Sequence, residues 1–338
     1  MKRSLSLIGV AVVIAVLGGC GGGVTTILAA LGIIKLHDIY TDVTEEISDN
    51  PEDTLTLMID GYVVRTDVPN RQGRVELNGL PEGRFLLSLI SPDYRRGWHA
   101  LVSIGETDHL EVNPFTGAII SGTVAREASG GGHVNVANAL VLAFRDGAAH
   151  IADGLGALSP GDAGVSYVLG LSDASGQFKL GPVEYGSWLV IAVLPGYKCD
   201  ARLVNVSAGH DATGLAFVLT EDENARTATI TGTVAREKTG TPLASALVRA
   251  DLTLPFVPPV SDGAYSRVKN ELGRTMREDN WVSVPFVAAT TGAAGTYTLR
   301  VPVGEMRLWA YKYGYRGAYI DVHTEVGGSL ARDFRLKD

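Results

Sequence analysis

ISGTVARE occupies residues 120–127, and ITGTVARE occupies residues 230–237. The two octapeptides differ only where Ser121 of the first is replaced by Thr231 in the second, and they begin 110 residues apart. Near-identity at a fixed spacing is the signature of a duplicated module. The chain is therefore expected to contain repeated domains.

Three longer segments extend the repeat. They are NRQGRVELNGLPEGRFLLSLISPDY at 70–94, DASGQFKLGPVEYGSWLVIAVLPGY at 173–197 and GAAGTYTLRVPVGEMRLWAYKYGY at 292–315. In each segment a glycine and the closing tyrosine lie 20 or 21 residues apart: Gly73 and Tyr94, Gly176 and Tyr197, and Gly295 and Tyr315. The chain therefore contains three copies of the module.

Apolar residues within the copies recur at every second position, which is the period of a half-buried β-strand. In GQFKL, Phe178 and Leu180 are expected to face a core while Gln177 and Lys179 face solvent. FLLSLI and WLVIAVL are continuously apolar and suit strands deep in a sandwich. The 41 glycines and 14 prolines punctuate these runs as in all-β domains.

ISGTVARE, NALVLAF, DASGQFKL and GSWLVIAVLPGY together resemble the carboxypeptidase regulatory-like domain. ITGTVARE, SALVRAD, GTYTL and YKYGY repeat that resemblance in the third copy. It implies an all-β chain of tandem antiparallel Greek-key β-sandwiches, transthyretin-like or Ig-like, after a short N-terminal signal or anchor helix. The family's members are accessory modules, so the resemblance specifies fold and hardly any activity.

The expected organisation has five parts. Residues 1–19 are a lipoprotein signal peptide, and 20–53 are a lipid-anchored tether with a short apolar segment. Residues 54–115 are a truncated first sandwich packed on its neighbour, because no clear opening strand precedes Leu55. Residues 116–222 form the second copy, and 223–338 form the third with a long inserted loop at 252–290.

The N-terminus has the three parts of an export signal: Lys2 and Arg3, an apolar core, and a small-residue exit. The exit resembles the bacterial lipobox, which consists here of Leu17, Gly18, Gly19 and Cys20. By that resemblance the chain is cut before Cys20, and fatty acyl chains such as palmitate anchor it in a membrane. Gly21 is not the aspartate of the common inner-membrane retention signal, so the outer membrane or the cell surface is the expected location.

Residues 24–36, VTTILAALGIIKL, follow the cysteine and are apolar. Thirteen residues are too few to span a bilayer, so they predict a short helix or a strand packed on the first domain. The alternative is an uncut, kinked membrane anchor over residues 5–36. A plain signal peptide cut elsewhere is a third possibility. The acidic segment at 41–53 is expected to be a solvated linker.

No pattern for catalysis or a cofactor was found. The chain has no HExxH, GxSxG or phosphate-binding glycine loop, and its seven histidines are scattered: His37, His99, His109, His133, His150, His210 and His323. The formal net charge of −8 argues against a nucleic-acid partner. Cys199 is then the one thiol besides Cys20, so no intrachain disulfide is expected. We therefore expect a non-enzyme without metal or cofactor.

The copies differ most in the loops inserted at about 145–172 and at 252–290. The second loop contains candidate ligand-binding aromatics: Phe256, Tyr265, Trp281 and Phe286. Val268, Leu272 and Met276 recur every four residues, which predicts a short amphipathic helix. Long loops on a rigid scaffold are frequent binding surfaces, although such aromatics more often extend a core.

Two functions remain open from the sequence. The first is a lipid-anchored, non-catalytic structural or adhesive scaffold of the cell envelope that interacts with envelope proteins or polysaccharide. The second is a glycan-binding surface lipoprotein that uses the loop of the third copy. Aromatics exposed in a row would favour the second.

Overall fold

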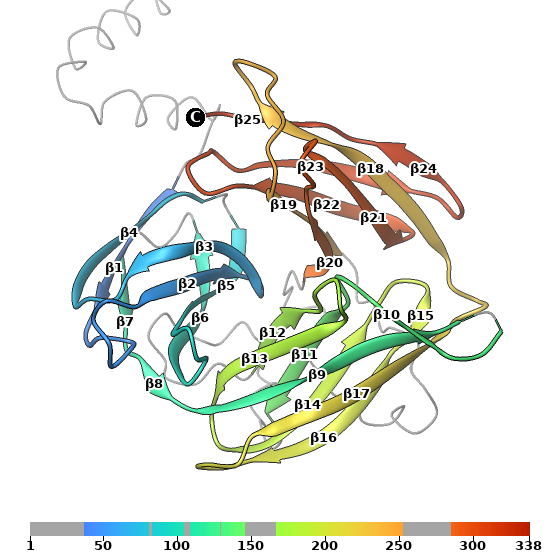
Figure 1. Cartoon of the computed structure of the whole chain (residues 1–338). Coiled ribbons are helices and arrows are strands. Elements are labelled where there is room, and N and C mark those ends of the chain that lie inside the picture. The colour runs from blue at the N-terminus through green and yellow to red at the C-terminus, as the bar shows by residue number, and fades with distance from the viewer. Residues whose placement is uncertain (1–36, 81–82, 105–108, 129, 146–166, 253–284) are drawn as a thin grey trace, which may run out of the picture.

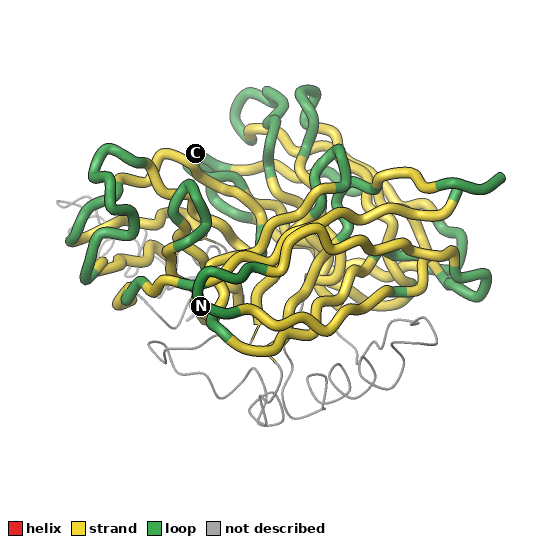
Figure 2. The backbone as a smooth tube through the Cα atoms, turned by 60° about the horizontal axis from the view of Figure 1, so that its bottom comes forward, coloured by secondary structure: helices red, strands yellow, loops and turns green. Residues whose placement is uncertain are grey.

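A computed structural model describes the chain at residues 37–80, 83–104, 109–128, 130–145, 167–252 and 285–338. These residues form 25 β-strands and no helix (Figures 1 and 2). The strands assemble into three β-sandwiches, at residues 37–116, 118–221 and 227–338, which we call the first, second and third sandwich. The all-β expectation is confirmed.

The first sandwich packs a three-stranded sheet on a larger one. The small sheet has the order β4 (Gly73–Leu80), β1 (His37–Val43), β7 (His109–Val112). The large sheet has the order β3 (Tyr62–Pro69), β2 (Thr54–Ile59), β5 (Gly83–Ile90), β6 (Arg96–Ile104), with the short β8 (Phe115–Thr116) beside β6.

The second sandwich repeats this plan. We keep the names small sheet and large sheet for the equivalent sheets of the second and third sandwiches, although there the small sheet has at least as many strands as the large one. Its small sheet centres on β9 (Ala118–Glu127), which pairs with β13 (Gln177–Val183) and β17 (Ala212–Glu221), and β10 (His133–Asn135) and β15 (Tyr197–Lys198) extend it. Its large sheet has the order β12 (Tyr167–Leu171), β11 (Leu140–Arg145), β14 (Gly186–Val193), β16 (Asp200–Val206).

The third sandwich has the same two layers. In its small sheet β18 (Thr227–Arg236) pairs with β21 (Thr296–Pro302) on one side and with β24 (Ser329–Ala331) and β25 (Phe334–Leu336) on the other. Its large sheet has the order β20 (Pro285–Thr290), β19 (Leu247–Leu252), β22 (Gly304–Tyr311), β23 (Ala318–Thr324).

The expectation of purely antiparallel sandwiches is wrong in one respect. The first strand of each sandwich runs parallel to the last: β1 with β7, β9 with β17, and β18 with β24 and β25. The other strand pairs are antiparallel. In each sandwich the chain enters and leaves the small sheet in the same direction and through neighbouring strands. Such neighbours form a parallel pair.

The first sandwich is not truncated, and its opening strand lies inside the segment expected to be a tether. β1 pairs along β4 and β7, and it buries Ile39, Thr41 and Val43. The following acidic loop is also fixed, because the buried Asn70 side chain accepts hydrogen bonds from the backbone amides at 47 and 48. A threonine in the middle of the buried face interrupts the apolar alternation, which is why the strand was missed.

Period-two alternation fills the cores as predicted. Phe178 and Leu180 are buried in the second sandwich, whereas Gln177 and Lys179 are exposed. They pack with Trp188 of the opposing sheet in a core of buried side chains. Truncating such a tryptophan to alanine typically costs about 3–5 kcal/mol.

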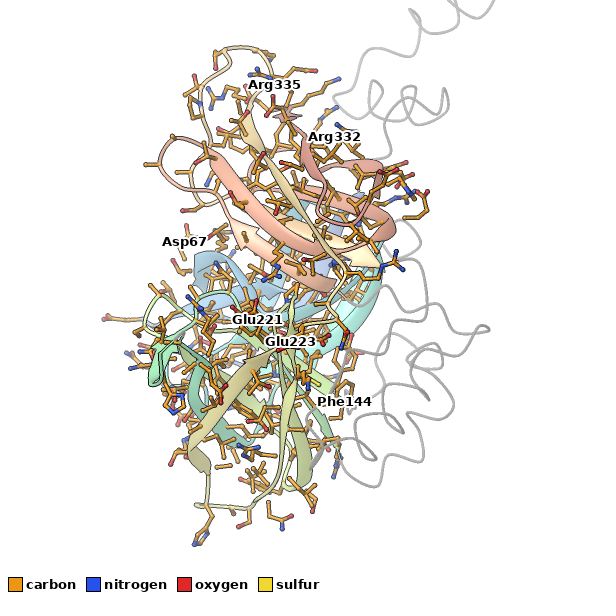
Figure 3. All side chains as sticks on the ribbon, turned by 90° about the vertical axis from the view of Figure 1, so that its right-hand side faces the viewer. Asp67, Phe144, Glu221, Glu223, Arg332 and Arg335 are labelled. Carbon is orange, nitrogen blue, oxygen red and sulfur yellow. The ribbon has the colours of Figure 1, made fainter. Side chains whose placement is uncertain are left out.

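The sandwiches do not form an extended row. Figure 1 shows the first sandwich (blue) beside both the second (green to yellow) and the third (orange to red). β14 has a continuous apolar sequence because both of its faces are buried. On its outer face, Leu189 and Ile191 join a cluster with Leu86 of the first sandwich and Val287 of the third. Glu221 and Glu223, labelled in Figure 3, mark the passage from the second sandwich to the third.

Candidate functional site

Most of the residues predicted as functional lie outside the described part of the chain. These are the lipobox residues Leu17, Gly18, Gly19 and Cys20, the expected helix residues Val268, Leu272 and Met276, and the aromatics Phe256, Tyr265 and Trp281. Phe286 lies in β20, and the structure describes its backbone but not its side chain. The insertions leave from equivalent connections, between β11 and β12 and between β19 and β20.

The described histidines are dispersed over the sandwiches. His323 Nδ1 lies 2.7 Å from a carboxylate oxygen of Glu305, and His109 lies 3.4 Å from Asp42. Within the described ranges, no group of three His, Cys, Asp or Glu side chains could hold a metal ion. In the same ranges, no helix has the length and apolar character to cross a membrane.

Cys199 is fully buried in the cluster on the outer face of β14. Burial raises the pKa of its thiol to about 12. Because the thiolate is the reactive form of cysteine, this side chain is a small apolar core residue at neutral pH. It is more deeply buried than the sequence suggested.

The three sandwiches meet at the two-residue turn between β2 and β3. Asp60 and Gly61 both have positive φ, at 49° and 76°, as a type I′ turn requires. The Asp60 carboxylate forms an ion pair with Arg249 of the third sandwich, and these side chains are only 2% and 1% exposed. Asp60 also accepts a hydrogen bond from the Leu86 amide at 2.9 Å, and the Arg249 guanidinium lies 4.3 Å from the Phe85 ring centroid.

The same turn also touches the second sandwich. A Cβ added at Gly61 would lie 2.6 Å from the Gly170 Cα and 2.6 Å from the Leu169 carbonyl oxygen, both in β12. The next residue, Tyr62, is buried in a small cluster that draws on all three sandwiches, with Leu171, Leu247 and Ala288. We call the turn and this cluster the three-sandwich junction.

Two further contacts join the first and third sandwiches. Trp309 of β22 packs edge-on against Phe85, with ring centroids 5.6 Å apart, inside the core of the first sandwich. At the margin, Arg65 donates a hydrogen bond of 2.8 Å to the Tyr313 hydroxyl and lies over that ring. The junction thus continues from a buried ion pair to a half-buried cation and ring.

His99 connects the first and second sandwiches. Its Nε2 lies 3.0 Å from the Pro182 carbonyl oxygen, and its Nδ1 lies 2.7 Å from Ser88 Oγ. Because the carbonyl can only accept, Nε2 carries the hydrogen and Nδ1 accepts from the serine hydroxyl. Burial lowers the pKa of His99 to about 4, so the ring is neutral at physiological pH.

The turn after β5 completes the contact between the first two sandwiches. Arg95 forms two hydrogen bonds with the Asp211 carboxylate, at 2.7 and 2.6 Å. Lys179 of β13 donates to the Asp93 carbonyl oxygen at 3.1 Å, and its ammonium lies 4.4 Å from the centroid of the Tyr94 ring. The repeated tyrosine of the sequence therefore holds the next module here.

A cleft of about 520 Å³ lies between these contacts. One wall is the outer face of the large sheet of the first sandwich, and the other consists of β9, β12 and β13 of the second. His99 and Tyr94 line the first wall, and Gly170 and Lys179 line the second. Clefts of this size at the boundary between domains are common ligand sites.

Sequence reasoning missed the junction and the cleft, although some signals were present. Asp-Gly between apolar runs is a strong hairpin signal, and the chain has it at 60–61. Arg249 interrupts the apolar run ALVRAD, which indicates a charge that needs a partner. Nothing local could reveal that the partner lies 189 residues earlier, at Asp60.

No protein-family model matches the chain, and no curated protein sequence matches it. Solved structures do match in shape. The chain is similar to the Bacillus anthracis TIE protein, with 13% identity, a TM-score of 0.23, and coverage of 89% of this chain and 51% of that one. It therefore spans about half the length of that protein.

Two further solved structures that are similar to the chain are a pilin and an enzyme. A streptococcal ancillary pilin is similar with 10% identity, a TM-score of 0.24, and coverage of 89% of this chain and 99% of that one. A 3-chlorocatechol 1,2-dioxygenase from Rhodococcus opacus 1CP is similar over 35% of this chain and 62% of its own, with 14% identity and a TM-score of 0.24. At these identities and TM-scores the likeness carries no conclusion about function.

Proposed function

We propose that this chain is an exported, lipid-anchored, non-catalytic scaffold of the cell envelope, at the outer membrane or cell surface. The observation that carries the proposal is a lipobox at Leu17–Cys20 followed by three sandwiches packed around one buried junction. Several acyl chains on one cysteine would hold such a unit on a membrane, because each buried methylene contributes about 0.8 kcal/mol. Envelope proteins or polysaccharide are its proposed partners.

The shared strand arrangement supports the finer assignment to transthyretin-like Greek-key sandwiches of the carboxypeptidase regulatory-like type. In each sandwich the opening strand is central in the small sheet, and the large sheet contains four strands in equivalent order: β3-β2-β5-β6, β12-β11-β14-β16 and β20-β19-β22-β23. The buried polar groups support a non-catalytic role. Asp60, Arg249 and His99 are each engaged by groups of a neighbouring sandwich, so they hold the scaffold together.

Replacement of the acylated cysteine tests the anchor. In Cys20→Ser the thiol that would carry the lipid is absent, so we expect the protein to move from the membrane fraction to the soluble fraction and to lose radiolabelled palmitate. Cys199→Ala is the matched control, because it removes the only other thiol and should leave both measurements unchanged. Retention of Cys20→Ser in membranes would instead support the uncut anchor over residues 5–36.

A second candidate is glycan binding by the loop of the third sandwich. It is favoured by the concentration of Phe256, Tyr265, Trp281 and Phe286 within one insertion of a rigid sandwich. Aromatic rings provide large contact area at low entropic cost. Trp281→Ala enters the binding experiment below as the variant that assigns binding to this loop.

A further inference from the structure

The cleft between the first and second sandwiches has one polar wall. Thr123 and Gln177 face each other across β9 and β13, as do Ser121 and Lys179. Among the described residues, the side chains of Ser121, Thr123 and Gln177 have no hydrogen-bond partner in the protein. Hydroxyl and amide groups both donate and accept, so this wall offers a row of two-way hydrogen-bonding groups to a ligand.

The opposite wall carries apolar side chains beside Ser88, Tyr94 and His99, and it is already in place. Met58 and Ile90 present their side chains from the large sheet of the first sandwich, and Val63 of β3 is 49% exposed beside them. The contacts of His99 with Pro182 and of Arg95 with Asp211 fix this wall against the second sandwich. A preformed cleft loses little entropy when a ligand binds.

The charges at the cleft balance. Lys179 contributes one positive charge and Asp173 one negative charge, and His99 is neutral. The Asp173 carboxylate already accepts from the amides of Ser175 and Gln177. An anionic ligand would need a surplus of cations, so a phosphorylated ligand does not fit this site.

An extended peptide cannot add to β12, an edge strand of the second sandwich that lines the cleft. Strand addition requires an open edge. Gly61 abuts Gly170 and the Leu169 carbonyl on that strand, and the Gly170 Cα faces Leu180 of β13. Residues 167–170 are buried as a result.

We propose that the cleft between the first and second sandwiches binds a neutral saccharide chain. The apolar wall takes the C–H faces of the sugar rings, and Ser121, Thr123 and Gln177 exchange hydrogen bonds with the hydroxyl groups. This inference deepens the proposed envelope function by assigning a ligand class, and its biological meaning rests on that function. The site is separate from the aromatic loop of the third sandwich.

The test uses the full chain in detergent, with an array of neutral hexose and N-acetylhexosamine oligosaccharides followed by calorimetric titration. The double variant Thr123→Ala/Gln177→Ala should bind the best saccharide about tenfold more weakly, because two hydrogen bonds to hydroxyl groups are lost. Ser121→Trp, which fills the cleft, should abolish binding. Melting curves of both variants establish that they are folded.

The matched control is Thr233→Ala/Thr296→Ala. These residues face each other at the corresponding positions of β18 and β21 in the third sandwich, and their removal should leave binding unchanged. Absence of saccharide binding, loss of binding only in Trp281→Ala, or capture of peptides in place of saccharides would each overturn the proposal. Membrane retention of the cleft variants and saccharide binding by Cys20→Ser are measured in parallel, so failure of the anchor and failure of the cleft are distinguished.

Discussion

At the scale of single residues, the most consequential contact is the buried pair of Asp60 and Arg249. A buried ion pair is not in itself a strong source of stability, because desolvation of both charges offsets their attraction. Removal of one partner lowers the stability strongly, because the other charge then stays buried without a counter-charge. The pair therefore favours one arrangement of the first and third sandwiches over alternatives.

Arg249→Met should destabilise this arrangement by about 3–5 kcal/mol, because the Asp60 carboxylate would stay buried without its cation. Urea unfolding followed by tryptophan fluorescence measures the change. Asp60→Asn/Arg249→Met should recover part of the loss, since asparagine tolerates the positive φ at this turn and carries no charge. Equal losses in the single and double variants would show that the charge is not the cause.

His99 makes stability depend on pH. Its pKa is lowered by burial from 6.5 to about 4, so the unfolded chain binds the proton more readily than the folded chain. The stabilisation is fully present above pH 6.5 and is lost as the pH falls towards 4, by about 3 kcal/mol in total. Chemical unfolding at a series of pH values should show this decline.

His99→Gln is the control, because it removes the titrating ring. Its unfolding free energy should be nearly flat over the same interval. Desolvation acts to raise the pKa of Asp93 and Asp211, but hydrogen bonds lower it below the usual 3.8, so these carboxylates titrate mainly below this interval. An equal decline in wild type and His99→Gln would contradict the assignment.

At the scale of elements, the connection that leads to the edge strand β3, β12 or β20 of each large sheet decides how neighbours can approach. In the first sandwich it is the two-residue turn at 60–61, whereas the equivalent connections, from β11 to β12 and from β19 to β20, contain residues 146–166 and 253–284. Only a tight turn can fit against the Cα of Gly170. The first sandwich thus presents this two-residue turn to both of the others.

Gly61→Ala tests this contact. The added Cβ meets β12 at 2.6 Å, so the variant should lose interface stability in addition to the backbone cost of a positive φ. Gly209→Ala is the matched control, because Gly209 has nearly the same φ, 75°, with no atom within 4 Å of an added Cβ. Thermal unfolding should place Gly61→Ala below Gly209→Ala by roughly 1–3 kcal/mol. Equal effects would mean that the turn does not support the junction.

At the scale of the whole molecule, local pattern predicted far more of the fold than of the site. The repeated octapeptide and the alternation at Phe178 and Leu180 predicted sandwiches, because strand periodicity is written in neighbouring residues. The opening strand β1 was missed, since Thr41 takes a buried position that the pattern assigns to an apolar residue. The junction and the cleft depend on which modules touch, and that is set by pairs far apart in sequence.

The contact between the first and third sandwiches also affects how the chain would respond to tension. β1 begins in the first sandwich and β25 ends in the third, and these sandwiches touch directly through Asp60, Arg249, Phe85 and Trp309. A pull between β1 and β25 would therefore load this interface before it strained the links that lead into and out of the second sandwich. The second sandwich would be shielded from force until the outer two had separated.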